Sequence, residues 1–222
     1  MSGNVSVKKK DEELGRRLNE LIEDCLVSST MGGPKWLVSK ETRVAIIGDA
    51  SKFYNKIEEL GLTPKIRLMI AMQLSLDNNK CPVNLSGRHD GHRMRLNDIR
   101  RARDITEVGR VEKPAEYVDS LVSFLVNTDR LRKEKAGGVA EIAKETLARY
   151  EERKIPISNP MTLSAAAVLY ACCKEGVPMS AFIIGNTTGL GGQSIWEASD
   201  RLIEIARPDE LFEFKAKKGP KG

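Results

Sequence analysis

The sequence predicts an all-α protein, and three observations lead to this expectation. Apolar residues recur every three or four positions along most of the 222 residues, whereas strict alternation is nearly absent. Aromatic residues make up only 5% of the chain, so the core must be mainly aliphatic and rich in alanine. Such a composition favours helices over a sandwich or barrel. A chain of this length can form one large domain or two small ones.

Helical spacing in the first half begins after a polar stretch. Residues 1–10 end in three consecutive lysines, and we expect them to form a flexible basic tail. Apolar stripes over residues 14–26 and 46–60 predict two helices. A third helix is expected after Pro64, because proline suits the first position of a helix. Together these helices would belong to a first domain over residues 11–110.

The second half continues with longer helices. Pro114 ends a short linker, and apolar stripes over residues 117–125 and 139–150 predict two further helices. Asn159 stands directly before a proline and is suited to cap the next helix. The run over residues 163–173 is apolar on almost all sides, which predicts a helix buried among its neighbours.

A glycine turn between two helices is expected near the end of this half. The sequence predicts a short helix over residues 179–186, a turn over 189–192, and a final helix from 193 or 194 to 206. Two short helices joined by a tight turn are the geometry of a helix-turn-helix. This motif would end a second domain over residues 114–207. Residues 208–222 are rich in lysine and are expected to form a second flexible tail.

The amino-acid sequence of the second half resembles a repeat of a known protein family. It reads N-P-M-T-L-S-A-A-A-V-L-Y-A-C-C-K-E-G-V-P-M-S from Asn159 and G-L-G-G-Q-S-I-W-E-A-S-D-R-L from Gly189, without gaps in spacing. The segment P-A-E-Y-V from Pro114 resembles the opening of the same repeat. These stretches are similar to the second cyclin-like repeat of the transcription factor IIB family, which includes archaeal transcription factor B. Residues 40–84 resemble the first repeat less closely.

The resemblance implies a fold and a function. It implies two cyclin-like helical repeats, the second ending in a helix-turn-helix, in a protein of archaeal or viral style. It further implies binding to DNA, or to a TATA-binding protein or other transcription machinery, and a role in modulating transcription initiation. The chain departs from the family because it lacks the cysteine pairs of the zinc ribbon.

The final helix departs from the family as well. The positions that match its DNA-reading residues are 191–198, and they contain no arginine but include Glu197. Gln193, Ser194 and Trp196 remain as candidates to reach a base edge or a phosphate. The alternative is that this helix serves packing or a protein partner, since phosphate neutralisation by basic residues dominates DNA affinity.

Arginine is concentrated between residues 88 and 110. The net charge is +5 and the isoelectric point about 9.0, which permits a nucleic-acid partner. Arginine suits contacts with phosphate and guanine, so this segment is the main candidate for DNA contact. A solvated basic helix is the alternative. The candidate residues are Arg88, Arg93, Arg95, Arg100, Arg101, Arg103 and Arg110.

Metal and phosphate-loop chemistry fit the sequence poorly. A metal site from Cys81, His89, Asp90 and His92 lacks the pair spacing of known zinc sites. The strand-like residues 181–184 precede a glycine-rich loop, but a phosphate loop ending at position 194 needs glycine at 187 and lysine at 193. Threonine and glutamine stand there instead. We therefore expect no metal, no cofactor and no enzyme activity.

General features place the protein in a reducing compartment. The four cysteines form no C-x-x-C pair, and no apolar run is long enough to span a membrane. We expect an intracellular protein, associated with the nucleoid if archaeal and nuclear if eukaryotic. Two functions stay open: a factor-B-like protein that binds DNA or a transcription partner, and a cyclin-fold scaffold that binds proteins only.

Overall fold

The fold is all-α with one small β-hairpin, as seen in a computed structural model that describes residues 3–30, 33–85, 94–109, 113–157 and 159–218. The predicted fold class is therefore confirmed. The elements in chain order are α1 (Gly3–Leu26), β1 (Val27–Thr30), β2 (Gly33–Trp36), α2 (Lys40–Lys56), η1 (Ile57–Leu60), α3 (Pro64–Asn78), α5 (Leu96–Thr106), η2 (Pro114–Tyr117), α6 (Val118–Asn127), α7 (Lys133–Glu152), α8 (Pro160–Lys174), α9 (Ala181–Thr188), α10 (Gly192–Ala206), η3 (Pro208–Glu210) and α11 (Leu211–Lys218).

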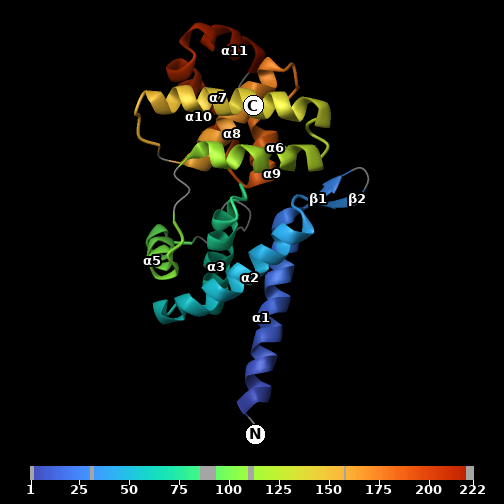
Figure 1. The fold of residues 1–222 in the computed structure, drawn as a ribbon, viewed down its shortest axis with the longest axis vertical. Coiled ribbons are helices and arrows are strands. Elements are labelled where there is room, and N and C mark those ends of the chain that lie inside the picture. The colour runs from blue at the N-terminus through green and yellow to red at the C-terminus, as the bar shows by residue number, and fades with distance from the viewer. Residues whose placement is uncertain (1–2, 31–32, 86–93, 110–112, 158, 219–222) are drawn as a thin grey trace.

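The helices form two lobes (Figure 1). The first lobe contains α1, α2, α3 and α5, and the second contains α6 to α11. Each lobe has its own buried core. In the second lobe α8 runs through the middle, where it packs against α7 and α10. Its residues from Leu163 to Cys172 are all buried, which confirms the expected central helix.

Side-chain caps fix where several helices begin. The Asn159 side chain accepts a hydrogen bond from the backbone N–H of Thr162 at 3.1 Å, as the sequence predicts. Ser39 caps α2 and Ser180 caps α9 in the same way, each at 3.2 Å. Such caps satisfy backbone donors that have no partner inside the helix. Polar residues just before each apolar run therefore set the boundaries of these helices.

The β-hairpin and the chain ends differ from the sequence-based expectation. Val27–Thr30 pairs with Gly33–Trp36 in antiparallel register, a hairpin too short for its alternation to stand out. Helix α1 already begins at Gly3, so residues 3–10 are helical where the sequence indicated no regular structure. Their flexibility stays a prediction. The lysine-rich end is likewise helical up to Lys218. The strand-like residues 181–184 belong to α9, because an apolar run of this length fits a buried helix equally well.

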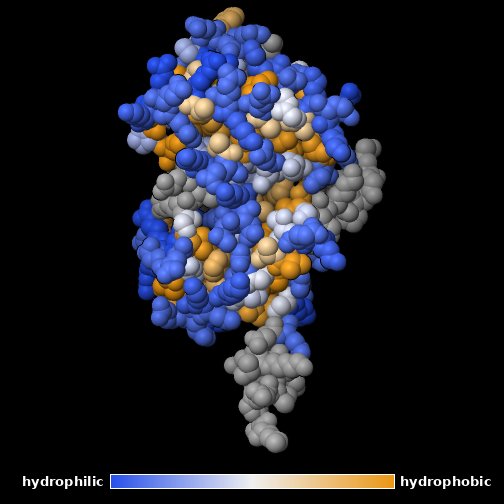
Figure 2. Space-filling model, in the orientation of Figure 1, coloured by the Kyte–Doolittle hydropathy of each residue, from blue (hydrophilic) through white to orange (hydrophobic). Residues whose placement is uncertain are grey.

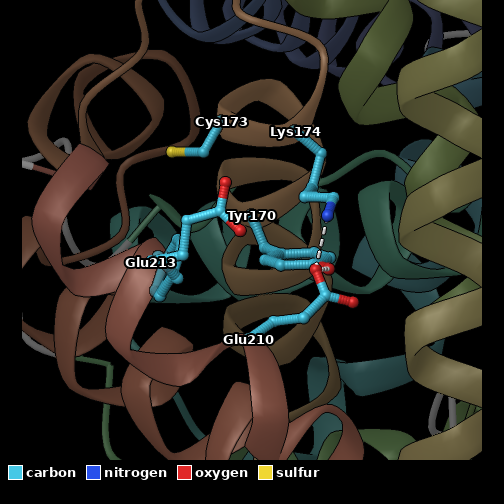
Figure 3. A pocket seen from close by; sticks show the side chains of 6 residues that line it. Tyr170, Cys173, Lys174, Glu210 and Glu213 are labelled. Atoms are coloured by element: carbon cyan, nitrogen blue, oxygen red, sulfur yellow. Dashed lines mark hydrogen bonds and ion pairs between the residues drawn. The ribbon is translucent and has the colours of Figure 1, made fainter.

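A polar cluster around Glu210 docks the C-terminal helix onto α8 (Figure 3). The Glu210 carboxylate accepts hydrogen bonds from the Tyr170 hydroxyl at 2.6 Å and from Lys174 Nζ at 2.5 Å. Arg207 contacts its other oxygen at 3.1 Å. The buried Phe214 ring lies against Tyr170 in a T-shaped contact, with 5.6 Å between the ring centres. These contacts attach residues 207–214 to the rest of the second lobe.

The Glu210 cluster gives the fold an acid-sensitive contact. Burial alone raises the pKa of Glu210, but hydrogen bonds from Lys174, Tyr170 and Arg207 outweigh it and lower the pKa from 4.5 to about 2. A carboxylate with a lowered folded pKa stabilises the fold above its unfolded pKa and loses this effect as pH falls. We expect Glu210→Gln to lower the free energy of unfolding by about 1 kcal/mol at neutral pH.

Urea unfolding across pH measures this effect. The difference between the wild type and Glu210→Gln is expected to shrink as pH falls from about 4.5 towards 2, since both side chains are then uncharged. Glu213→Gln, in the first turn of the adjoining helix α11, is the control. A difference that does not change with pH would contradict the role of the Glu210 charge.

Among the described residues, a buried ring and several polar contacts join the two lobes. Phe124 of α6 is only 1% exposed and packs into the core of the first lobe. The Asn127 side chain donates to the Leu37 carbonyl at 3.0 Å, and the Asn84 backbone N–H donates to the Thr188 carbonyl at 2.7 Å. Lys80 forms an ion pair with Glu116 at 2.6 Å. These contacts fix the position of the two lobes relative to each other.

A cleft of about 570 Å³ lies between the lobes. It is lined by the start of α2, the end of α3, one face of α6 and the first turn of α7. Its wall mixes valines with serine, threonine and asparagine side chains. Hydrophilic residues cover most of the face seen in Figure 2, and apolar residues show in separate patches between them. Among the described residues, no helix is both long and apolar enough to cross a membrane.

Candidate nucleic-acid interface

Helix α5 presents arginine on its outer side. Its inner side is fixed by Ala102 and Thr106, which are buried against the rest of the first lobe. Arg95, Arg100 and Arg101 are exposed, and none of them forms an ion pair with a residue that the structure describes. The predicted helix is therefore present. Arg100 and Arg101 lie on it and Arg95 directly before it, and all three side chains are exposed to water. Three further candidates, Arg88, Arg93 and Arg110, lie outside the described residues.

Arg103 points inward instead. Its guanidinium forms an ion pair with Asp77 of α3, whose side chain is only 6% exposed, and it also donates to the Gly109 carbonyl at 3.3 Å. Burial raises the pKa of Asp77, and the Arg103 charge acts against that rise. A buried carboxylate needs such a partner, because an unpaired buried charge is costly. Arg103 therefore has a structural role in this lobe, and its contact with nucleic acid stays a prediction that this ion pair weighs against.

Charge is distributed unequally between the two halves of the sequence. Residues 1–113 contain 21 Lys and Arg against 16 Asp and Glu, a net charge of +5. Residues 114–222 contain 15 Lys and Arg against 15 Asp and Glu, a net charge of 0. A polyanion is attracted to the first of these by net charge and is not attracted to the second. Net charge therefore favours the half that contains α5 over the half that contains α9 and α10 as a surface for a polyanion.

The two helices α9 and α10 meet at a tight glycine turn, as predicted, although α9 begins two residues later than expected. Gly189 ends α9 with φ of +75°, a conformation that favours glycine. Gly185 lies so close to the turn that a Cβ atom there would be 2.7 Å from the Leu190 carbonyl oxygen. A Cβ on Gly192 would meet the Phe182 ring at the same distance. Glycines in the sequence thus determine how closely α10 approaches α9.

Because the chain packs so closely at Gly185, adding one methyl group there should lower the stability of the fold. Gly185→Ala is expected to lower the free energy of unfolding by about 1–3 kcal/mol, because the new Cβ must push the backbone of the turn away. Gly137→Ala in α7 is the matched control, since no other residue lies within 4 Å of its Cβ position. The control should raise stability by about 0.5–1 kcal/mol. Chemical denaturation of both variants checks this, and equal effects would contradict the account of the turn.

The three candidate residues of α10 lie near its start. Gln193 and Ser194 are exposed, and Gln193 Nε2 donates to Glu197 Oε1 at 2.6 Å. Trp196 is half-buried and packs against the core of the second lobe. The Gln193 amide is thus engaged by an acidic neighbour on its own helix. These three residues belong to α10, and Figure 1 shows α10 and α5 in different lobes.

The cysteine candidate for a metal site is buried. Cys81 is 2% exposed, and burial together with Asp77 raises the pKa of its thiol to about 12. A metal ligand would need the thiolate, which this setting disfavours. His89, Asp90 and His92 lie outside the described residues, and the part of the chain that is described contains no group of three metal-ligating side chains.

No protein-family model and no curated protein matches this chain. The assignment to the factor-B family and to cyclin-like repeats accordingly stays a prediction. The residues that sequence reasoning missed are Gln73 and Asp77, which hold α5 in place from inside the first lobe. Their spacing of four residues within the buried stretch Met69–Asp77, which is otherwise apolar except for Ser75, is the signal that could have indicated a buried polar network.

Proposed function

We propose that this protein binds nucleic acid through the exposed arginines at and directly before α5 and acts as a factor-B-like modulator of transcription with two cyclin-like repeats. The observation that carries the proposal is the contrast within α5. Arg103 forms an ion pair with Asp77. By contrast, the side chains of Arg95, Arg100 and Arg101 are exposed to solvent and form no ion pair with the described residues. Arginines placed in this way can exchange counterions for phosphates.

The second lobe favours a different partner. Residues 114–222 have a net charge of 0, and α10 itself carries Glu197, Asp200 and Glu204 against the one cation Arg201. This local acidity and the Gln193–Glu197 contact speak against phosphate binding by α10. We propose that this lobe contacts protein, with a TATA-binding protein or another part of the transcription machinery as the partner that the family resemblance suggests. The competing function, a scaffold that binds proteins only, uses the same lobe and differs by requiring no contact at α5.

A pair of substitutions separates these functions. Arg100→Ala with Arg101→Ala is expected to weaken binding to a short DNA duplex by about tenfold at low salt, because two phosphate contacts are lost. Arg130→Ala with Arg132→Ala is the matched control, since these residues are also exposed arginines but lie in the second lobe. Fluorescence anisotropy measures both. A scaffold that binds only proteins would show no duplex binding, and equal losses in the two variants would mean non-specific attraction.

A further inference from the structure

A chain of hydrogen bonds begins at α5 and runs through the first lobe. Arg103 contacts Asp77, and Gln73 Nε2 donates to Asp77 Oδ1 at 3.0 Å. Gln73 also donates to the Val83 carbonyl at 3.1 Å and accepts from the Leu85 backbone N–H at 2.9 Å. Gln73 and Asp77 are both almost fully buried. The position of α5 is therefore tied to the segment of residues 83–85.

The same segment reaches the second lobe. Asn84, between the two residues that Gln73 holds, donates its backbone N–H to the Thr188 carbonyl at 2.7 Å. Thr188 is the last residue of α9 and fully buried, and its hydroxyl accepts from the Leu190 backbone N–H at 3.3 Å. Figure 1 shows the end of α3 next to α9, in agreement with this contact. The bonds thus form one path from α5 to the α9–α10 turn.

We propose that this path, from Arg103 through Asp77, Gln73 and residues 83–85 to Thr188, is a relay that couples α5 to the α9–α10 turn. A polyanion on α5 would then change the conformation or mobility of the turn, and with it the surface that α10 offers to a partner. The members cannot shift independently, because each broken bond would leave a buried polar group without a partner. The part of this proposal that concerns the polyanion rests on the proposed function.

The coupling is tested first in the free protein. Gln73→Met keeps the volume of the side chain but removes its hydrogen bonds, so amide exchange at Leu190 should become several-fold faster relative to amides of α7. Ser75→Ala is the matched control. Ser75 is also a buried polar residue of α3, but it donates to the Ile46 carbonyl and lies off the relay. Unchanged exchange at Leu190 in Gln73→Met, or an equal effect of Ser75→Ala, would overturn the relay.

A second measurement adds a short DNA duplex. In the wild type, saturating duplex should change amide exchange at Leu190, and in Gln73→Met it should bind with little change at that amide. Binding is followed separately by anisotropy, so the two proposals can fail separately. If the duplex binds the wild type and leaves Leu190 unchanged, the coupling is refuted. If the duplex does not bind at all, the proposed function fails, and the free-protein measurement alone decides whether the relay exists.

Discussion

Phe124→Ala is expected to lower the free energy of unfolding by about 3–5 kcal/mol, the usual cost of removing a large aromatic side chain from a packed core. Phe124 belongs to α6 of the second lobe, yet it is 1% exposed and packs among core residues of the first. Its loss would leave a cavity where the lobes meet. The effect should therefore reach both lobes, because neither can fill the space alone.

Urea unfolding followed by circular dichroism measures this loss. Phe212→Ala is the control, since Phe212 is 88% exposed and its removal should change stability by less than about 0.5 kcal/mol. In Phe124→Ala we further expect the lobes to unfold less cooperatively. This would appear as a smaller slope of the free energy of unfolding against urea concentration. A loss no larger than that of the control would show that the ring does not join the two cores.

Arg103→Ala is expected to lower the free energy of unfolding by about 2–4 kcal/mol at neutral pH, because it leaves the Asp77 carboxylate buried without its partner. Arg100→Ala, three residues earlier on the exposed side of α5, should change stability little. This contrast separates an arginine that holds the fold from one that is free to bind a ligand. Chemical denaturation of the two variants at one pH measures it.

The pH dependence of Arg103→Ala follows from Asp77. Burial raises the pKa of Asp77 above its ordinary 3.8, and loss of Arg103 removes the charge that opposes this rise. A folded pKa above the unfolded one means that stability falls as pH rises between the two values. The deficit of Arg103→Ala should thus be largest at neutral pH and shrink as pH falls towards 3.8. A deficit independent of pH would contradict a buried carboxylate as its cause.

Periodicity predicts the helical fold well where the helices are long. The buried run of α8 and its Asn159 cap follow directly from residue type and spacing. Short elements are less predictable: four-residue strands show too little alternation, and the apolar start of α9 fits a strand or a helix equally. The ends of the chain were expected to be irregular because they are polar. Phe214 is the residue that docks the last helix, through a contact with Tyr170 that no local pattern indicates.

The candidate site could be predicted only in part. An arginine cluster is visible in the sequence, and so is the helix that carries Arg100, Arg101 and Arg103. Which of the three turns inward depends on Asp77, which lies 26 residues earlier in the sequence and is brought to α5 by the packing of α3. The family resemblance places Trp196 and Ala198 where arginines would stand, with Glu197 between them, so the sequence alone predicts that α10 is a poor site for phosphate. Contacts between residues distant in the sequence therefore determine which arginines form internal ion pairs and which stay exposed.

The salt dependence of duplex binding tests the central claim most directly. Affinity for a short DNA duplex should fall steeply as salt rises, because phosphate contacts release counterions. In Arg100→Ala with Arg101→Ala, the slope of log affinity against log salt should be smaller by about 2, one unit for each lost contact. Arg130→Ala with Arg132→Ala should keep the wild-type slope. Binding that is insensitive to salt, or a slope unchanged by loss of Arg100 and Arg101, would contradict nucleic-acid binding by α5.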